Sequence, residues 1–519
     1  MDMSRQTLET APSRKLLWSC AGLTALAAAL VIARLVPVGV PGQWVMGYIA
    51  DPSWSGLWLA LGSLGLVLLL CGAVWAKLET ARLYEEALAL AMLVAFLFAM
   101  QFGIGALGQV GSQEAFIALT TRATTNLYFA ESGTIDNAGD YLRGYNRHAA
   151  ETKNGWQLKT HPPGPVMFFY AARCAVKACP LLKDAALGLA NALIPNELYW
   201  RNVDSFRFLD ATLDRDAEAA GWLAVAALRL AAALSVVPLY LLARALYGRR
   251  NALAAAALAG LVPSLLLFNV IIDQLYPLIA LTAALIAYHA AKRRSLLLNI
   301  LCGIVLYVGL LFSLSFLVIF ITISAVQSMI LLSDRKGLDL PRSLMMVLRM
   351  FECILIGVLG SFMLVEVTVG FQTFWSWVQC GIGNSKFNVA AGRTYWAWLL
   401  ANPIVFAAFL GVPAAVLFAR ALGADAARLL KERRPAAADP FAVCSFAVIA
   451  ALWLWGANLG EVERLWMPLM PLCVMAGVGR LALSRTALLA LIGLQGIQAV
   501  VFKLTLDPLG FGQIIRNII

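Results

Sequence analysis

Charged side chains are scarce in this chain. They make up 13% of its 519 residues, compared with roughly 25% in a soluble globular domain. Hydrophobic residues make up 61%, and the mean hydropathy is +0.79. The shortage of charge excludes an ordinary soluble protein and indicates an integral membrane protein. Strands of about 10 residues with alternating polarity are also missing, which excludes a membrane β-barrel.

Histidine and cysteine are too few and too scattered to predict a metal site. The chain has three histidines and nine cysteines, and no Cys/His spacing typical of bound zinc occurs. Most of the cysteines lie within apolar segments, where they behave as small apolar residues. Cys174, Cys179 and Cys380 fall on the predicted outer side of the membrane, so one disulfide among them is an open alternative.

Apolar segments of about 20 residues are abundant, and this is the length that a helix needs to cross a hydrocarbon core roughly 30 Å thick. They predict an all-α polytopic membrane protein with about thirteen transmembrane helices. The first segment is expected to be a retained span, because no small-residue cleavage site follows it. The predicted spans are residues 16–36, 54–76, 86–110, 217–246, 251–270, 272–291, 296–313, 315–333, 345–369, 396–420, 440–457, 464–483 and 486–504.

Lysine and arginine gather in short clusters between the apolar segments, and these clusters predict the orientation. Cytoplasmic loops carry an excess of positive charge, so the N-terminus is expected to be cytoplasmic. The net charge of +11 then belongs to inside loops, and no nucleic-acid partner is expected. The same alternation places residues 111–216 and 370–395 outside.

Residues 111–216 form a polar segment too long to be a simple connection. Because it must begin and end outside, the apolar run 163–178 is not expected to cross the membrane completely. We expect a helix lying in or dipping into the interface. The alternative is that 163–178 crosses the membrane and the weaker run 181–195 crosses back.

The stretch "KTHPPGPVMFFY" begins that apolar run. Proline lacks a backbone donor and has a restricted φ, so Pro162 and Pro163 are expected to start a helix. They would hold His161 outside the helix, where it faces a substrate cleft. The alternative is that His161 caps the helix or bonds to a neighbouring carbonyl.

The second outer region contains Lys386 and Arg393 among tryptophans and tyrosines. Cations in an external loop oppose the usual preference for positive charge inside, so they suggest an anionic headgroup as partner. The aromatic residues alone are also explained by a belt at the membrane interface.

Three more charged residues lie at the outer ends of later spans. Asp273 is costly there unless it faces a cavity, although it could also cap the following helix. Glu463 and Arg464, which form a dense cluster with Glu461 in "GEVERLWMPL", could simply pair with each other. An arginine in that place is also well suited to bind a phosphate group.

The segment "ALRLAAALSVVPLYLLARALYGRRNALAAAALAGLVPSLLLFNVIID" resembles the core of membrane-embedded glycosyltransferases of the GT-C superfamily. The likeness is greatest to the branch of the protein O-mannosyltransferases and lipid A aminoarabinose transferases. Its landmarks are Arg229 with Leu230, Gly248 with Arg249, Pro263, Asp273, and the Pro-Pro motif in Thr160 to Gly164. If Arg229 lies deep in its span, it needs an acidic partner. Together these landmarks cover residues 86–290.

The resemblance implies a reaction outside the cytoplasm. A sugar on a polyprenyl-phosphate donor would be transferred, with inversion, to a glycan, lipid or protein acceptor at the periplasmic face of a bacterial inner membrane. Members of this branch carry an acidic pair after their first family helix as the source of the general base. Here Gln113 and Glu114 stand there, so Asp136 and Asp140 are rivals. We favour Asp136 over Glu114.

The remaining roles follow from the same resemblance. We expect substrate contacts from His161, Tyr145, Asn146 and Asp273, and phosphate contacts from Lys386, Arg393, Arg464 and Glu463. Some GT-C enzymes use a divalent ion such as Mg²⁺ or Mn²⁺. The available cations favour a reaction here without an obligatory metal.

Three parts are predicted along the chain: an added pair of helices in residues 1–85, a catalytic core in 86–333, and C-terminal helices in 334–519.

Two other functions stay open. A ligase or polymerase of surface polysaccharide would place several arginines and a histidine in a later loop. A transporter or flippase of lipid-linked sugars would tend to show internal repeats and helices interrupted near the midplane.

Overall fold

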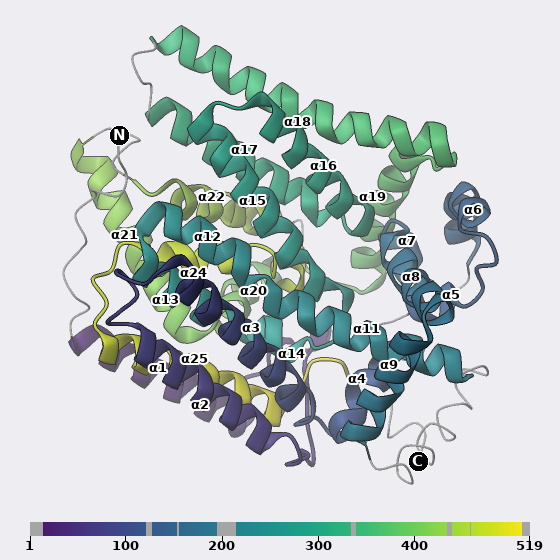
Figure 1. The fold of residues 1–519 in the computed structure, drawn as a ribbon, viewed down its shortest axis with the longest axis horizontal. Coiled ribbons are helices and arrows are strands. Elements are labelled where there is room, and N and C mark those ends of the chain that lie inside the picture. Colours follow the sequence, from purple (N-terminus) through teal and green to yellow (C-terminus); the bar gives the residue numbers. More distant parts are fainter. Residues whose placement is uncertain are drawn as a thin grey trace.

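The computed structural model describes residues 14–120, 127–152, 155–194, 214–333, 339–432, 438–456 and 458–510. Within them the chain is a bundle of α-helices (Figure 1). Long helices run side by side along the horizontal direction of that view, and a group of shorter helices lies at its right-hand end. The strands are short and form two small ladders, β1 (Gly39–Val40) with β2 (Trp44–Val45) and β3 (Gly47–Tyr48) with β4 (Leu506–Asp507).

Eight helical segments of the described part are long and apolar enough to cross a membrane, or up to ten if two bent pairs each form one span. Their outward faces are apolar: Leu69 is 70% exposed and Val367 is 78% exposed. Such surface is stable against lipid and not against water, which confirms an all-α polytopic membrane protein. The eight segments are α1 (Arg14–Ile32), α2 (Leu57–Val74), α3 (Leu83–Gly105), α11 and α12 (Arg215–Leu234 and Val236–Tyr247), η3 and α15 (Ile272–Leu275 and Tyr276–Arg293), α17 (Ser315–Ser333), α18 (Leu340–Val369) and α25 (Arg485–Thr505).

The other predicted spans are shorter or broken, so the expected number of thirteen is not confirmed. Residues 251–270 form two helices, and residues 464–483 contain one short apolar helix. The helices concerned are α13 (Arg249–Gly260), α14 (Pro263–Leu267), α16 (Leu296–Phe312), α22 (Pro440–Trp455) and α24 (Met470–Gly479).

Predicted span 396–420 is bent by 112° between α20 (Tyr395–Leu410) and α21 (Val412–Glu432). Gly411 at the bend has φ +93°, and a Cβ there would lie 2.2 Å from Nε2 of Gln495. Gln495 Nε2 donates to the Leu410 carbonyl at 2.8 Å, and Gln498 Nε2 donates to the Ala408 carbonyl at 2.9 Å. The first bond satisfies the Leu410 carbonyl at the bend, and the second adds to the bond that the Ala408 carbonyl already accepts from the Gly411 N–H at 3.3 Å.

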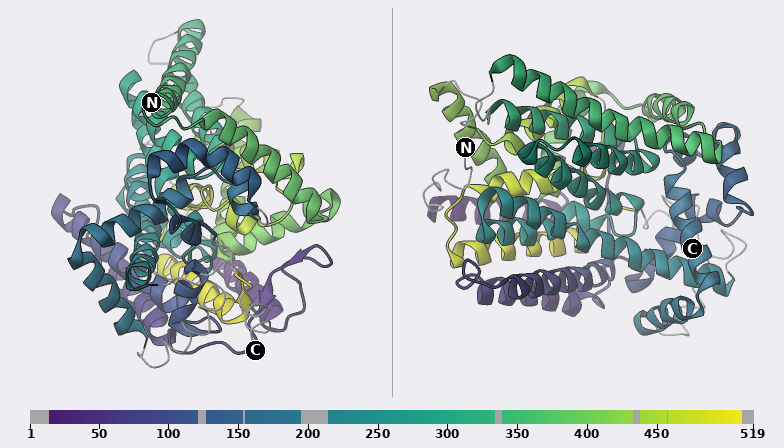
Figure 2. Two further views of the ribbon diagram at one scale, coloured as in Figure 1. Left: turned by 90° about the vertical axis from the view of Figure 1, so that its right-hand side faces the viewer. Right: turned by 45° about the horizontal axis from the view of Figure 1, so that its top comes forward.

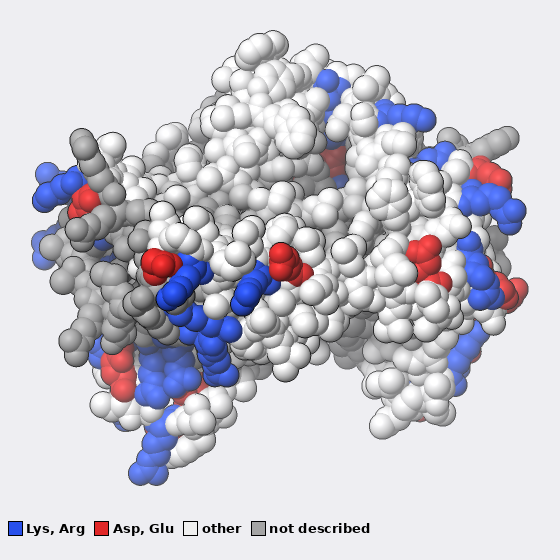
Figure 3. Space-filling model, turned by 90° about the horizontal axis from the view of Figure 1, so that it is seen from above, with Lys and Arg blue, Asp and Glu red and all other residues white. Residues whose placement is uncertain are grey.

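The predicted cytoplasmic loops are held by arginines that bond to backbone carbonyls. Arg249 donates to Leu78, Glu79 and Ala81, and Arg250 donates to Trp75. In Figure 3, Lys and Arg side chains lie mostly toward the left and right of the molecule, and the surface between them is largely white. This is the distribution expected of a protein whose middle faces lipid.

Short helices cover the opposite end of the bundle, as Figure 2 (left) shows. They belong to the predicted outer segment, and α8 and α9 meet at 110°. Each is too short to span a membrane alone, in accord with the expectation of an interfacial or dipping helix. The elements are η2 (Gly111–Gln113), α4 (Glu114–Thr120), α5 (Leu127–Ser132), α6 (Ala138–Glu151), α7 (Trp156–Thr160), α8 (Gly164–Ala178) and α9 (Pro180–Leu193).

The second predicted outer loop, 370–395, is mostly a helix, α19 (Thr373–Ala390). One of its glycines serves packing. A Cβ at Gly383 would lie 2.2 Å from the Lys159 carbonyl oxygen, so only glycine allows α19 to approach α7 this closely. The contact brings the two outer regions together.

Candidate functional site

A cavity of about 450 Å³ lies where the outer helices meet the bundle. Its walls come from α5, α7, η3, α17 and α19, together with residues 452–469. This volume is within the range of about 300 to 1,000 Å³ usual for small-molecule sites. Four predicted site residues line it: His161, Asp273, Arg393 and Arg464.

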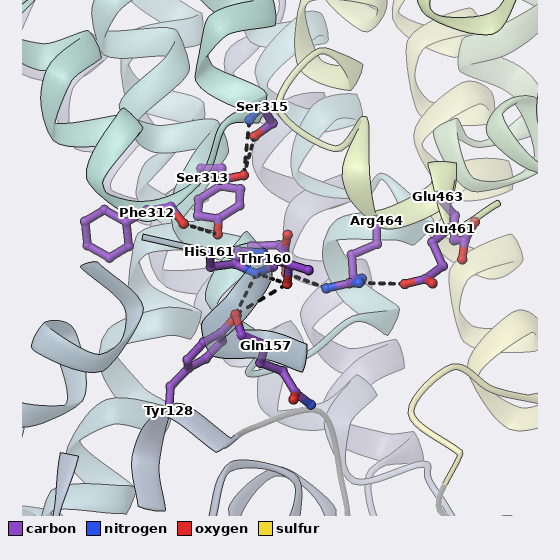
Figure 4. A network of polar contacts seen from close by, with 12 residues as sticks. Tyr128, Gln157, Thr160, His161, Phe312, Ser313, Ser315, Glu461, Glu463 and Arg464 are labelled. Carbon is purple, nitrogen blue, oxygen red and sulfur yellow. Dashed lines mark hydrogen bonds and ion pairs between the residues drawn. The ribbon is translucent and has the colours of Figure 1, made fainter. Parts of the chain in front are cut away.

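Two arginines and two carboxylates form a chain of ion pairs in this cavity (part of it is drawn in Figure 4). Arg464 Nη1 lies 3.3 Å from Asp273 Oδ2, and its Nη2 lies 2.6 Å from Glu461 Oε2. The other oxygen of Glu461 pairs with Nη2 of Arg393. We call Asp273, Arg393, Glu461 and Arg464 the cavity cluster. A guanidinium group has five N–H donors, so both arginines retain donors for a ligand.

The electrostatics of the cavity cluster favour full ionisation of Glu461. Burial alone would raise the pKa of Glu461, but the guanidinium groups of Arg464 and Arg393 outweigh it and lower the pKa to about 2. The two positive charges are therefore matched by two negative ones. An anionic ligand must compete with Glu461 or Asp273 for the arginines.

The backbone on both sides of the cavity is strained. Glu461 has φ +58°, and Val270, three residues before Asp273, has φ +64°. A positive φ is rare for a β-branched residue. The Val270 N–H donates to Gln274 Oε1 at 2.6 Å, which helps hold this conformation. Such strain costs about 1–3 kcal/mol per residue and clusters at functional sites.

Arg229 supports the same strained loop from behind. Its side chain is buried in α11, and its Nε donates to Asn269 Oδ1 at 2.7 Å. Its guanidinium carbon lies 4.1 Å from the centre of the Phe102 ring. The amide and the aromatic face contact the guanidinium directly, and the acid that the sequence leads one to expect is Glu114, which acts on it through its charge and not through an ion pair.

His161 lies between two helices, as the Pro-Pro motif predicts. It follows α7 in extended conformation, with φ −129° and ψ 146°, and α8 begins at Gly164 after Pro163. Its Nδ1 lies 3.3 Å from the Gln157 carbonyl oxygen. Nδ1 also lies 3.0 Å from the Thr160 hydroxyl, which donates to the Trp156 carbonyl at 2.8 Å. The tautomer with its proton on Nδ1 suits both neighbours and leaves Nε2 as the basic nitrogen. Figure 4 shows His161 beside Thr160, with Tyr128 nearby.

His161 is expected to be neutral at physiological pH. Burial lowers its pKa from the ordinary value of 6.5; Asp273 opposes this shift, and Arg464 adds to it. A neutral imidazole beside a carboxylate can accept a proton, and the carboxylate stabilises the imidazolium that forms.

Tyr145 and Asn146 do not line the cavity but tie its walls together. The buried Tyr145 hydroxyl donates to the His161 carbonyl at 2.8 Å and lies 3.2 Å from that of Leu158. Asn146 Nδ2 donates to the Gln372 carbonyl at 3.0 Å and links α6 to the start of α19. These contacts support positioning roles, and the predicted substrate contacts stay predictions.

The three predicted bases lie elsewhere. Asp136 is exposed just before α6, and Asp140 in its first turn pairs with Arg143 at 2.5 Å. The helix dipole stabilises acids in this position, which gives Asp136 and Asp140 a structural explanation. Glu114 is a buried first-turn acid of α4 and pairs with Lys503. None of them lines the cavity, so their catalytic roles stay predictions.

Lys386 and Glu463 also point away from the cavity. Lys386 is exposed on α19. Glu463, on α23 (Val462–Leu465), is 1% exposed, and neither of its carboxyl oxygens has a hydrogen-bond partner among the described residues. Burial raises its pKa to about 8. The predicted pair of Glu463 with Arg464 is corrected, because Arg464 pairs with Glu461.

Glu461 is the charged member of the site to which the sequence prediction, although it named the residue, gave no role. The signal was present, since residues three apart on a helical turn face the same side and adjacent ones do not. The amides of Gln157, Asn384, Asn388 and Asn458 were also missed. They come from separate segments, and only the fold shows that they meet.

The residues present do not fit a bound metal well. Asp273 and Glu461 already pair with arginines, and the described part of the chain has no group of three His, Cys, Asp or Glu placed to hold an ion. The carboxylates of the cavity are thus engaged by arginines and not free to bind Mg²⁺ or Mn²⁺. All nine cysteines are unpaired, so no disulfide joins Cys174, Cys179 and Cys380.

Comparisons with known proteins do not identify a function for the chain. No family model matches the chain, and no curated protein matches its sequence.

Proposed function

We propose that the protein is a membrane glycosyltransferase that moves a sugar from a polyprenyl-phosphate donor to an acceptor hydroxyl. The observation that carries the proposal is the cavity cluster. Two arginines with spare donors lie in a cavity of about 450 Å³, at the end of the bundle that positive charge predicts to be outside. Arginine binds phosphate oxygens bidentately and stabilises charge that develops on them.

The walls of the cavity suit a ligand that is polar at one end and apolar at the other. Val318 and Ile319 of α17, Leu452 of α22 and Leu469 supply apolar surface beside the arginines. Isoprene units would pack on these side chains, and the phosphate would face Arg464 and Arg393. A polyprenyl phosphate combines both features in one molecule.

The reaction follows from this placement. The acceptor oxygen attacks the anomeric carbon, and the bond from that carbon to the phosphate oxygen breaks. The acceptor proton passes to Nε2 of His161, and the bond electrons stay on the phosphate, which Arg464 and Arg393 stabilise. Asp273 holds Arg464 and faces the imidazolium. The anomeric centre inverts because a single displacement occurs.

The test uses the full chain in lipid nanodiscs with defined polyprenyl-phosphate sugars and a membrane extract as source of acceptor. The proposal expects release of free polyprenyl phosphate together with a glycosylated product, and loss of both with Arg464→Ala. Movement of intact donor between leaflets without cleavage would instead identify a flippase. Transfer of a preassembled polymer but not of a single sugar would identify a ligase.

A further inference from the structure

The cavity has a second wall that the cavity cluster does not form. Trp156 and Gln157 of α7 and Asn384, Phe387 and Asn388 of α19 line it. We call these five residues the amide wall. Amides offer one donor group and one acceptor group each, and aromatic rings offer flat apolar faces. This combination suits a sugar, whose hydroxyls need both partners and whose C–H faces are apolar.

The amide wall is built by close packing of its two helices. Asn384 Nδ2 donates to the Thr160 carbonyl at 3.2 Å and to the Cys380 carbonyl at 2.9 Å. Its Oδ1 is left as an acceptor. The side chains of Asn388 and Gln157 have no hydrogen-bond partner among the described residues, and both are only half-buried. Their bonding capacity is therefore available to a ligand.

The amide wall is continuous with the arginines. The guanidinium carbon of Arg393 lies 5.2 Å from the centre of the Phe387 ring. The Phe387 ring in turn lies 5.8 Å from that of Trp156, at an interplanar angle of 65°. A group attached to a phosphate on Arg393 would thus lie over these rings.

The side chains of the amide wall carry no charge, and Lys159, whose Nζ lies 6.0 Å from the centre of the Trp156 ring, does not line the cavity. The charged side chains of the cavity, among the residues described, are already paired with one another. A carboxyl group on a bound sugar would have to share Arg393 with Glu461 and the donor phosphate, and an amino group would have to draw Glu461 from its two arginines. Both are unfavourable in a partly buried site. An uncharged sugar meets no such penalty.

We propose that the amide wall is the subsite for the transferred sugar and that this sugar is uncharged. The proposal rests on the proposed function, because it takes the phosphate of the donor to lie at Arg464 and Arg393. It adds the substrate class: a neutral hexose, and neither an amino sugar nor a uronic acid.

The experiment compares three donors in nanodiscs with the full chain: polyprenyl phosphates carrying an uncharged hexose, an amino sugar and a uronic acid. The uncharged donor should react at least tenfold faster, in kcat/KM, than either charged donor. Asn388→Ala should raise the KM for the uncharged donor about tenfold, whereas Gln379→Ala should leave it unchanged. Gln379 is a matched control, because it is an exposed amide on the same helix that does not line the cavity.

A charge introduced into the amide wall sharpens the result. Asn388→Asp should improve use of the amino-sugar donor relative to the uncharged one. Equal or faster reaction of a charged donor, with Asn388→Ala no different from Gln379→Ala, would overturn the subsite while leaving the transferase intact. Cleavage of none of the three donors would overturn the proposed function, and this inference with it.

Discussion

Two buried ionic clusters at different places in the molecule use the same chemistry and differ in what surrounds them. In the first, the cavity cluster, Arg464 joins Asp273 and Glu461 beside a cavity of about 450 Å³. In the second, Asp425 pairs with Arg480 at 2.7 Å and with Arg428 at 3.1 Å. The space there is only about 10 Å³, roughly the volume that one water molecule needs.

The second group, which we call the sealed cluster, also has its own structural task. Tyr247 donates to Asp439 Oδ2 at 2.5 Å, and Asp439 Oδ1 accepts from the first backbone amides of α22. Arg480 and Tyr247 thus join neighbouring helices, whereas Arg428 pairs with Asp425 within α21. The comparison teaches that paired buried charges do not by themselves mark a ligand site. A ligand site also needs open space beside unused hydrogen-bond donors, as the cavity cluster has. Substitutions in the two clusters should therefore have different effects.

The largest difference is expected for histidines. His161→Asn removes the proposed base, and loss of a general base typically lowers the rate about 100- to 10,000-fold. His289→Asn, on α15 and away from the cavity, should leave it nearly unchanged. Donor turnover by purified protein is the measurement. Asp136→Asn in the same assay decides between rival bases: a large loss there with activity retained in His161→Asn would assign the proton to Asp136.

The next largest difference is expected between arginine substitutions in the two clusters, one of which should lower activity and the other stability. Arg464→Ala removes a charge-assisted phosphate contact worth about 1.5–3 kcal/mol, which corresponds to a rate loss of roughly 10- to 150-fold. Arg480→Ala should instead lower thermal stability and yield while the remaining folded protein keeps its specific activity. If both variants lost activity only in proportion to folded protein, the two clusters would be equivalent and the distinction would fail.

The pH dependence of activity should follow the protonation of His161. Only the neutral imidazole can act as base, and burial lowers the pKa of His161 below 6.5. Activity should therefore persist as the pH falls through 6.5 and decline only at lower pH, where the imidazole becomes protonated. A profile of kcat/KM against pH measures this limb. A decline that begins above pH 7 would contradict the assignment.

The smallest expected effect concerns Glu463. Its pKa in the folded protein is about 8, above the ordinary 4.5, so the folded state keeps a proton that the unfolded state releases between these values. Its contribution to stability is therefore lost as the pH rises from about 4.5 to about 8. Glu463→Gln should raise the thermal midpoint by a few degrees at pH 8 and change it little near pH 4.5. In the sealed cluster, Asp425→Asn should lower the midpoint. A lower midpoint for Glu463→Gln at pH 8 would mean that the carboxylate form has a partner.

The sequence was sufficient for the fold class, because the shortage of charge and the length of apolar segments follow from the membrane itself. It was insufficient for the number of spans. The bend at Gly411 depends on Gln495 and Gln498 of a distant helix, and no local pattern reports it. Likewise, the expected outer loop 370–395 is mostly the helix α19, in which Gly383 allows close packing against α7.

Part of the site was predictable for a physical reason. A charge at the outer end of an apolar segment is costly without a partner, and Asp273, Arg393 and Arg464 indeed pair through one cluster. Asp136 and Asp140 stay predictions as bases, and their place before and within the first turn of α6 also has a structural explanation, because the helix dipole stabilises acids there. The amide wall was not predictable, since uncharged amides carry no such cost and become a site only where two helices pack together.

The central claim is that the cavity cluster binds the phosphate of a polyprenyl-phosphate donor. An experimental structure of the full chain in nanodiscs with added polyprenyl phosphate tests it most directly. We predict phosphate density within hydrogen-bonding distance of Arg464 and Arg393, with the isoprene chain beside α17. Phosphate density near Asp136 and Arg143 on α6, with the cavity unchanged and the Arg464–Glu461 pair intact, would contradict it.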